Sequence, residues 1–207
     1  MKKRMKKIGA VCCMTLLCLG LWACSSSDGS RKENEKSNSV QVDNQGKKNN
    51  KENDTEEVSE NGFPVYMPEF STTDMDGKKV TNAIFSEYDL TVVNFWATYC
   101  NPCIDELPEL AKWKKELPDN VNLIGLLVDV DDKESDQYHL AEKIIKETGA
   151  DYQHLIATEA FDDMISNLVG VPTTFLIDKE GKIVGEPFAG ADVGAYKRAV
   201  EEYQNGK

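Results

Sequence analysis

The sequence is short of positive charge, histidine and long apolar runs. Of its 207 residues, 24 are Lys or Arg, 36 are Asp or Glu and only 2 are His, which gives a net charge of -12. This acidic balance argues against a nucleic-acid-binding protein, because phosphate binding relies on Lys and Arg. The N-terminal apolar run, residues 8–23, is shorter than the ~20 residues that a transmembrane helix needs. The composition excludes a multi-span membrane protein and argues against a nucleic-acid-binding protein.

The N-terminus is typical of an export signal. The apolar run at residues 8–23 follows a short basic head that contains no acidic residue (Lys2, Lys3, Arg4, Lys6 and Lys7). The run ends in Leu-Trp-Ala-Cys at residues 21–24, which resembles the bacterial lipobox. That resemblance implies cleavage after Ala23, lipidation of the Cys24 thiol, and a place on the outer face of the cytoplasmic membrane. An ordinary signal peptide, or a short anchor helix with Cys24 as a bystander, is the alternative.

The cysteine count shrinks once the signal is removed. Three of the six Cys lie within residues 1–23, and Cys24 is the predicted anchor. Only Cys100 and Cys103 then remain, with two residues between them. An exported domain with a single close pair is not a disulfide-stapled scaffold.

The rest of the chain divides into a linker and one domain. Residues 25–61 contain only three large apolar residues, Val40, Val42 and Val58, so they cannot bury enough surface to offset the entropy of ordering. We therefore expect a lipid-anchored disordered linker at 24–61. Residues 62–207 are long enough for one well-buried core and carry 27 acidic and 13 basic residues.

Hydrophobic patterning predicts alternating strands and helices in this domain. The expected strands are 65–70, 90–96, 121–130, 153–156, 173–177 and 182–187, with the last two forming an antiparallel hairpin around a turn at 178–181. The expected helices are 101–117, 135–148, 159–168 and 192–203. Strands and helices that alternate, followed by a hairpin and a final helix, predict an α/β fold with a central mixed sheet and helices on both faces.

The Cys pair lies where a buried strand ends and a helix begins. Disulfide exchange needs one thiolate to attack and a second thiol to resolve the mixed disulfide. Cys100 is expected at the helix N-terminus, where the helix dipole and free N–H groups stabilise a thiolate. Cys103 lies one turn later, and Pro102 suits a first helical turn. A purely structural disulfide and half of a metal site are the alternatives.

Several motifs around this pair resemble those of a known family. Residues 95–103, Phe-Trp-Ala-Thr-Tyr-Cys-Asn-Pro-Cys, resemble the active-site segment of thioredoxin-fold proteins, and Pro108 matches the proline that kinks their helix. Residues 170–173, Gly-Val-Pro-Thr, resemble the loop whose cis-proline lies beside the Cys pair. Residues 103–108 resemble the TlpA/ResA-like branch. The resemblance covers most of 62–207 and implies a thioredoxin-like thiol–disulfide oxidoreductase without a metal or other cofactor.

The resemblance also suggests how the second thiol loses its proton. Thioredoxin has a buried Asp six residues before the first Cys, where this chain has Asn94, which cannot titrate. Glu106 is the substitute, because at i+3 from Cys103 it lies on the same helix face. A protonated carboxyl can donate a proton, and an ionised one disfavours a neighbouring thiolate. The alternative is a solvated Glu106 that stabilises the helix N-terminus.

Four further residues are expected around the Cys pair. The backbone of Val171, before Pro172, offers N–H and C=O groups to an extended substrate segment. Trp96 and Tyr99 are expected to be partly packed and partly substrate-facing, with ordinary core packing as the alternative. For Pro172 the alternative is a proline at the start of a strand.

The resemblance favours a reductant. Electrons would come from a membrane thiol carrier of the CcdA/DsbD kind, and the clients would be exported proteins such as apocytochrome c or an extracellular methionine sulfoxide reductase. A disulfide-forming oxidase is the nearest alternative. A copper-binding thiolate module and a redox-inactive adhesion or scaffold domain come from other classes. A peroxidase is disfavoured, because the peroxiredoxin pattern has Thr where this chain has Ala97.

Two weaker signals carry no function. The acidic segment 129–136 fails as a calcium loop, because its sixth position is Glu134 and its twelfth is Leu140. We interpret it as a solvated loop that leads into a helix. His139 and His154 have no ligand spacing, and we expect both to be structural or surface residues.

Overall fold

The computed structural model describes Ser59 and residues 62–206. The predicted signal peptide, Cys24, and all of the predicted linker except Ser59 lie outside the described residues. Within the part that is described, no helix combines the length and the apolar character that crossing a bilayer requires.

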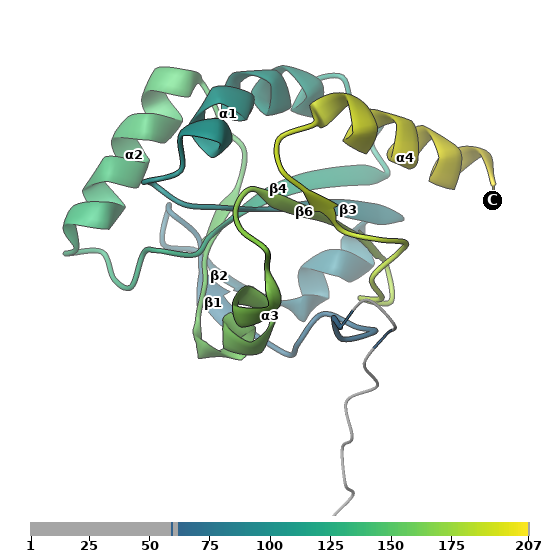
Figure 1. Cartoon of the computed structure of the whole chain (residues 1–207), viewed down its shortest axis with the longest axis horizontal. Coiled ribbons are helices and arrows are strands. Elements are labelled where there is room, and N and C mark those ends of the chain that lie inside the picture. Colours follow the sequence, from purple (N-terminus) through teal and green to yellow (C-terminus); the bar gives the residue numbers. More distant parts are fainter. Residues whose placement is uncertain (1–58, 60–61, 207) are drawn as a thin grey trace, which may run out of the picture. The chain divides into compact units, whose positions relative to one another are not determined.

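A five-stranded mixed sheet forms the centre of the domain (Figure 1). Its strand order is β5-β4-β3-β6-β7, with β4 and β5 parallel to β3, and β6 and β7 in antiparallel pairs. The strands are β3 (Leu90–Trp96), β4 (Val121–Leu127), β5 (His154–Ile156), β6 (Thr173–Asp178) and β7 (Phe188–Ala189). The predicted α/β class with a mixed sheet is confirmed.

Both faces of this sheet are covered, as predicted (Figure 1). Side chains alternate along β3, so Val92 and Trp96 join one core while Val93 and Phe95 join the other. The first core contains α1 (Asn101–Lys114), α2 (Asp136–Thr148) and α4 (Val193–Asn205). The second contains α3 (Asp162–Asn167), the 3-10 turns η1 (Asn82–Glu87) and η2 (Glu159–Phe161), and the hairpin of β1 (Ser71–Thr73) with β2 (Lys79–Thr81).

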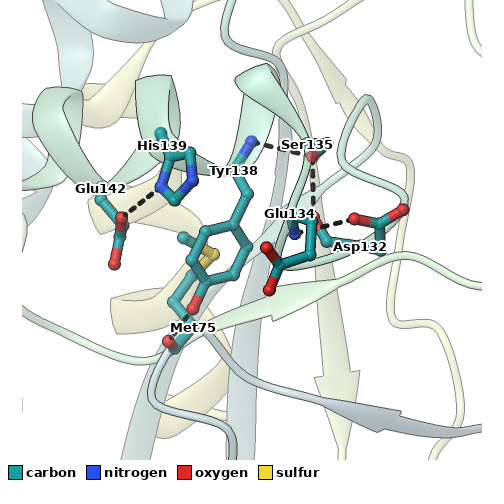
Figure 2. Close-up of polar contacts among 7 residues, drawn as sticks. All are labelled: Met75, Asp132, Glu134, Ser135, Tyr138, His139 and Glu142. Atoms are coloured by element: carbon teal, nitrogen blue, oxygen red, sulfur yellow. Dashed lines mark hydrogen bonds and ion pairs between the residues drawn. The ribbon is translucent and has the colours of Figure 1, made fainter.

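Local chemistry fixes the two ends of α2. Ser135 caps the N-terminus, where its hydroxyl oxygen accepts from the Tyr138 N–H at 3.1 Å (Figure 2). Gly149 ends the helix in the left-handed conformation, at φ 68°. The Tyr138 hydroxyl donates to the Met75 carbonyl at 2.5 Å, so α2 is tied to the turn between β1 and β2.

Residues 131–134 and His139 are exposed, as expected, but the solvated-loop interpretation is wrong for Val130, which is buried, and for Asp129, which is half-buried. Asp132 accepts from the backbone N–H of Glu134 at 2.8 Å, so its carboxylate organises its own loop. His139 is exposed and lies 3.1 Å from Glu142. Among the described residues, no three His, Cys, Asp or Glu side chains are placed so that they could hold a metal ion together.

Two predicted strands are wrong. Residues 65–70 form no strand, and only Tyr66 makes an isolated bridge, to Lys182. In the predicted strand 182–187, only Ile183 bridges to β6, at Ile177. The strand that pairs with β6 at this edge is β7, Phe188–Ala189. Prolines without an N–H donor, at 68 and 187, and a left-handed glycine at 185 interrupt both segments.

Candidate active site

Cys100 and Cys103 are joined by a disulfide at the start of α1. Their Sγ atoms are 2.08 Å apart, and both residues are buried, Cys100 at 6% and Cys103 at 0% exposure. Cys100 is the N-cap residue of α1, and its Sγ accepts from the Cys103 N–H at 3.2 Å. The same N–H and the positive end of the helix would stabilise a Cys100 thiolate once the pair is reduced. The slightly exposed Cys100 is therefore suited to attack and the inaccessible Cys103 to resolution.

A second loop borders Cys100, as the sequence predicts. The carbonyl oxygen of Val171 lies 3.2 Å from Cys100 Sγ, and the Val171–Pro172 peptide bond is cis. Tyr99, next to Cys100 in the chain, is 72% exposed, and Val169, two residues before Val171, is 97% exposed. The structure thus brings the Cys pair and the cis-proline loop together.

Glu106 is buried, at 5% exposure, so the alternative of a solvated first-turn Glu is wrong. Asn94 donates to its Oε1 at 2.8 Å and also to Thr174 Oγ1 at 2.9 Å. Burial raises the pKa of Glu106 to about 7, although hydrogen bonds from Asn94 and Tyr196 lower it and the charge of Glu109 adds to the rise. A carboxyl in this condition can take up or release a proton near neutral pH.

The prediction that Trp96 partly faces the substrate is wrong, because this side chain is fully buried. Its Nε1–H donates to His154 Nδ1 at 3.1 Å, and the opposite ring nitrogen of His154 donates to the Ala150 carbonyl at 2.8 Å. Desolvation lowers the pKa of His154 to about 4, only partly opposed by the bond to Ala150. His154 is therefore a neutral structural residue, and core packing describes Trp96.

Asp129 is a residue of the site that sequence reasoning missed. It follows the strand β4, and its carboxylate accepts from both the backbone N–H and the hydroxyl of Thr98, at 3.0 and 2.5 Å. It therefore holds the loop that precedes Cys100. Its position just after a buried strand was the available signal, but the surrounding acidic residues pointed to a solvated loop.

Tyr196 is the second missed residue. It lies on α4, is fully buried, and places its hydroxyl 3.3 Å from Glu106 Oε2. Sequence spacing gives no signal for this contact, because 90 residues separate the two partners.

This fold, with its Cys pair at the end of β3 and a cis-proline loop beside it, defines the thioredoxin-fold class of thiol–disulfide oxidoreductases. The chain belongs to the AhpC/TSA family, whose sequence profile matches residues 65–185.

Two curated relatives agree with that class. The thiol-disulfide oxidoreductase ResA of Bacillus thuringiensis is 31% identical over 123 residues, which are 58% of this chain and 65% of the relative. The thiol:disulfide interchange protein DsbE of Haemophilus influenzae is 32% identical over 124 residues, covering 59% of this chain and 62% of the relative. The chain therefore spans slightly less than two thirds of the length of these relatives.

A solved structure shows the same fold. The thioredoxin domain of a thiol-disulfide oxidoreductase from Bacteroides vulgatus superposes with a TM-score of 0.55 at 23% identity, covering 67% of this chain and 94% of that one.

Proposed function

We propose that the chain is an extracytoplasmic, membrane-anchored thiol–disulfide oxidoreductase that reduces disulfides of exported proteins. The observation that carries the proposal is the Cys100–Cys103 disulfide at the N-terminus of α1, with the Val171 carbonyl 3.2 Å from Cys100 Sγ. A structural bridge over so short a loop would stabilise little by chain entropy. A redox role accounts better for its position.

In the proposed reaction the reduced pair gives two electrons to the substrate. The Cys100 thiolate attacks one sulfur of the substrate disulfide, that bond breaks, and the first substrate thiolate leaves. Cys103, as a thiolate, then attacks Cys100 Sγ. The mixed disulfide breaks, the second substrate thiol is released, and the Cys100–Cys103 disulfide remains.

Glu106 is the proposed proton carrier for the second step. Cys103 is fully buried, so its thiol cannot lose a proton directly to water. Glu106 lies on the same helix face, and its raised pKa, about 7, suits proton exchange near neutral pH. The ionised carboxylate accepts the Cys103 proton, and the neutral acid returns it when the pair is reduced again.

The backbone at Val171 and Pro172 is the proposed substrate contact, together with the exposed Tyr99. An extended client segment would pair with the backbone of this loop, as in strand addition. The side chain of Tyr99 would then cover the segment on the other side of Cys100.

Anchoring and partners follow from the N-terminal residues and from the chemistry. Cleavage after Ala23 and lipidation of Cys24 would hold the domain near the membrane through the 24–61 linker. A membrane thiol carrier of the CcdA/DsbD kind would re-reduce the pair, and apocytochrome c or methionine sulfoxide reductase are clients of the expected type. Replacing Cys24 with Ser should release the protein from the membrane fraction.

The reduction potential of the Cys100–Cys103 couple tests the proposal. The full chain is equilibrated in defined thiol buffers, alkylated, and read at the peptide that carries both cysteines by mass spectrometry. A value near that of thioredoxin, about -270 mV, supports a reductant, whereas one near about -120 mV, like that of DsbA, means a disulfide-forming oxidase. Absence of a reversible couple would overturn both and favour thiolate copper binding.

A further inference from the structure

Tyr196 brings together two segments that the proposed reaction leaves unconnected. Its hydroxyl lies 2.7 Å from the carbonyl oxygen of Gly190, accepts from the Asp192 N–H at 3.2 Å, and lies 3.3 Å from Glu106 Oε2. A carboxyl on α1 and the backbone of the loop between β7 and α4 thus meet at one oxygen atom.

This hydroxyl has one proton and two possible acceptors. An ionised Glu106 competes with the Gly190 carbonyl for that proton, because hydrogen bonds to charged acceptors are the stronger ones. A protonated Glu106 can instead donate to the Tyr196 oxygen, so the tyrosine proton stays on Gly190. The charge of Glu106 therefore decides how strongly the Gly190 carbonyl is hydrogen-bonded.

Gly190 also contacts the loop beside Cys100. Its N–H donates to the Pro172 carbonyl at 2.8 Å. Pro172 follows Val171, whose carbonyl lies 3.2 Å from Cys100 Sγ. The carbonyl held by Tyr196 and the N–H that contacts Pro172 belong to adjacent peptide groups joined at the Cα of Gly190, so the hold of Tyr196 on the carbonyl positions the N–H at the Pro172 contact.

The other groups that face Glu106 do not make this link. Glu109, on the same helix, acts on it through charge and is itself 3.0 Å from Lys197 of α4. Tyr152, which precedes β5, is buried, and its raised pKa keeps it neutral. Asn94 on β3 donates hydrogen bonds to Glu106 and to Thr174 on β6. Neither Asn94 nor Thr174 titrates.

We propose that Tyr196 is a positioning residue that couples the protonation of Glu106 to the backbone of the Val171–Pro172 loop through Gly190. When Glu106 takes the Cys103 proton, the tyrosine proton is committed to Gly190; when Glu106 loses it, the Gly190 bond weakens. The substrate-contacting loop thereby responds to the proton step of the reaction. This inference rests on the proposed function and adds a regulation of the same site.

Replacing Tyr196 with Phe in the full, oxidised chain tests the coupling. The titration of Glu106 is followed by carbon NMR of its carboxyl, assigned with Glu106→Gln, together with the amide signal of Gly190. Without the tyrosine donor the Glu106 midpoint should rise by about half a unit to one unit. In the native chain the Gly190 amide should shift with the same midpoint, and in Tyr196→Phe this response should be lost.

Tyr203→Phe is the matched control, because Tyr203 lies on the same helix and its hydroxyl donates to the Asp89 carbonyl instead. It should leave the Glu106 midpoint and the Gly190 response unchanged. An unchanged midpoint with a retained Gly190 response in Tyr196→Phe would overturn the proposal, whatever that variant does to stability. The titration needs no substrate, so a chain without a reversible redox couple would refute the proposed function while leaving this result readable.

Discussion

At the scale of single residues, burial decides the chemistry of Glu106. The i+3 spacing from Cys103 places it on the right helix face, but its 5% exposure raises its pKa to about 7. Spacing alone is equally consistent with a solvated, fully ionised Glu. The proposed proton role therefore depends on what the sheet and α4 place around the carboxyl.

Replacing Glu106 with Gln should lower the titration midpoint of the Cys103 thiol, because an ionised carboxylate nearby disfavours the thiolate. Alkylation of the reduced full chain at increasing pH measures this midpoint, with the label assigned to Cys100 or Cys103 by fragmenting their shared peptide in the mass spectrometer. Asp105→Asn is the control, since Asp105 is exposed and at i+2 does not face Cys103. An unchanged Cys103 titration in Glu106→Gln would remove Glu106 from the mechanism.

Gly125 is another residue whose role is invisible without packing. A Cβ added there would overlap His154 Nδ1 and lie 2.9 Å from Trp96 Nε1. Gly125→Ala should therefore cost about 1–3 kcal/mol of unfolding free energy, because neither buried ring can yield without disturbing the bond between them. Urea unfolding measures the loss. Gly170→Ala is the control, as nothing lies within 4 Å of its added Cβ, and equal stability of both variants would contradict the account.

At the scale of elements, short polar signals fixed both ends of α2 and the start of α4, whereas α1 ends at Lys114 rather than at residue 117. Ser135 and Gly149 bound α2 where the pattern predicts, and Asp192 caps α4 by accepting from the Ala195 N–H at 2.9 Å. Strand assignments depended more on pairing partners, which explains the two strands that were wrong. A segment that contains proline can pair only where the neighbouring strand does not need the missing N–H donor.

Ser135→Ala should destabilise the domain by about 1 kcal/mol, because the Tyr138 N–H loses its capping acceptor (Figure 2). Thermal or urea unfolding of the full chain measures this. Ser135→Asp keeps an acceptor at the cap and should retain the native stability. If the Asp variant lost as much as the Ala variant, the cap would not be the cause.

At the scale of the whole molecule, two buried groups oppose each other in the dependence of stability on pH. The pKa of Glu106 is raised from 4.5 to about 7, so its contribution is full at low pH and lost as pH rises through that range. The pKa of His154 is lowered from 6.5 to about 4, so its contribution is full at high pH and lost as pH falls. The two slopes nearly cancel between the ordinary pKa values of the two groups.

In the Glu106→Gln variant only the contribution of His154 should remain, so the unfolding free energy of the variant should rise with pH. The difference in unfolding free energy between Glu106→Gln and the native oxidised chain should grow by on the order of 2 kcal/mol between about pH 5 and pH 7, in favour of the variant. Denaturant unfolding at a series of pH values measures it, with Asp105→Asn as the control. A difference independent of pH would show that the Glu106 carboxyl has an ordinary pKa.

The sequence by itself determined the α/β class, the position of Cys100 and Cys103 at a strand–helix junction, and the loop at 170–173. These features depend on local chemistry, namely apolar periodicity, cap residues and the spacing of two thiols within one turn. Residues close in sequence are close in space in any fold, so such signals survive without a structure.

Only the tertiary structure decided which residues surround the pair. Burial of Trp96 against His154, the hold of Asp129 on Thr98, and the contact of Tyr196 with Glu106 each join positions 31 to 90 residues apart. Sheet order and helix packing create these neighbours, and no local pattern records them. The same packing removes water from Glu106, which is why its proton affinity could be known only once the fold was complete.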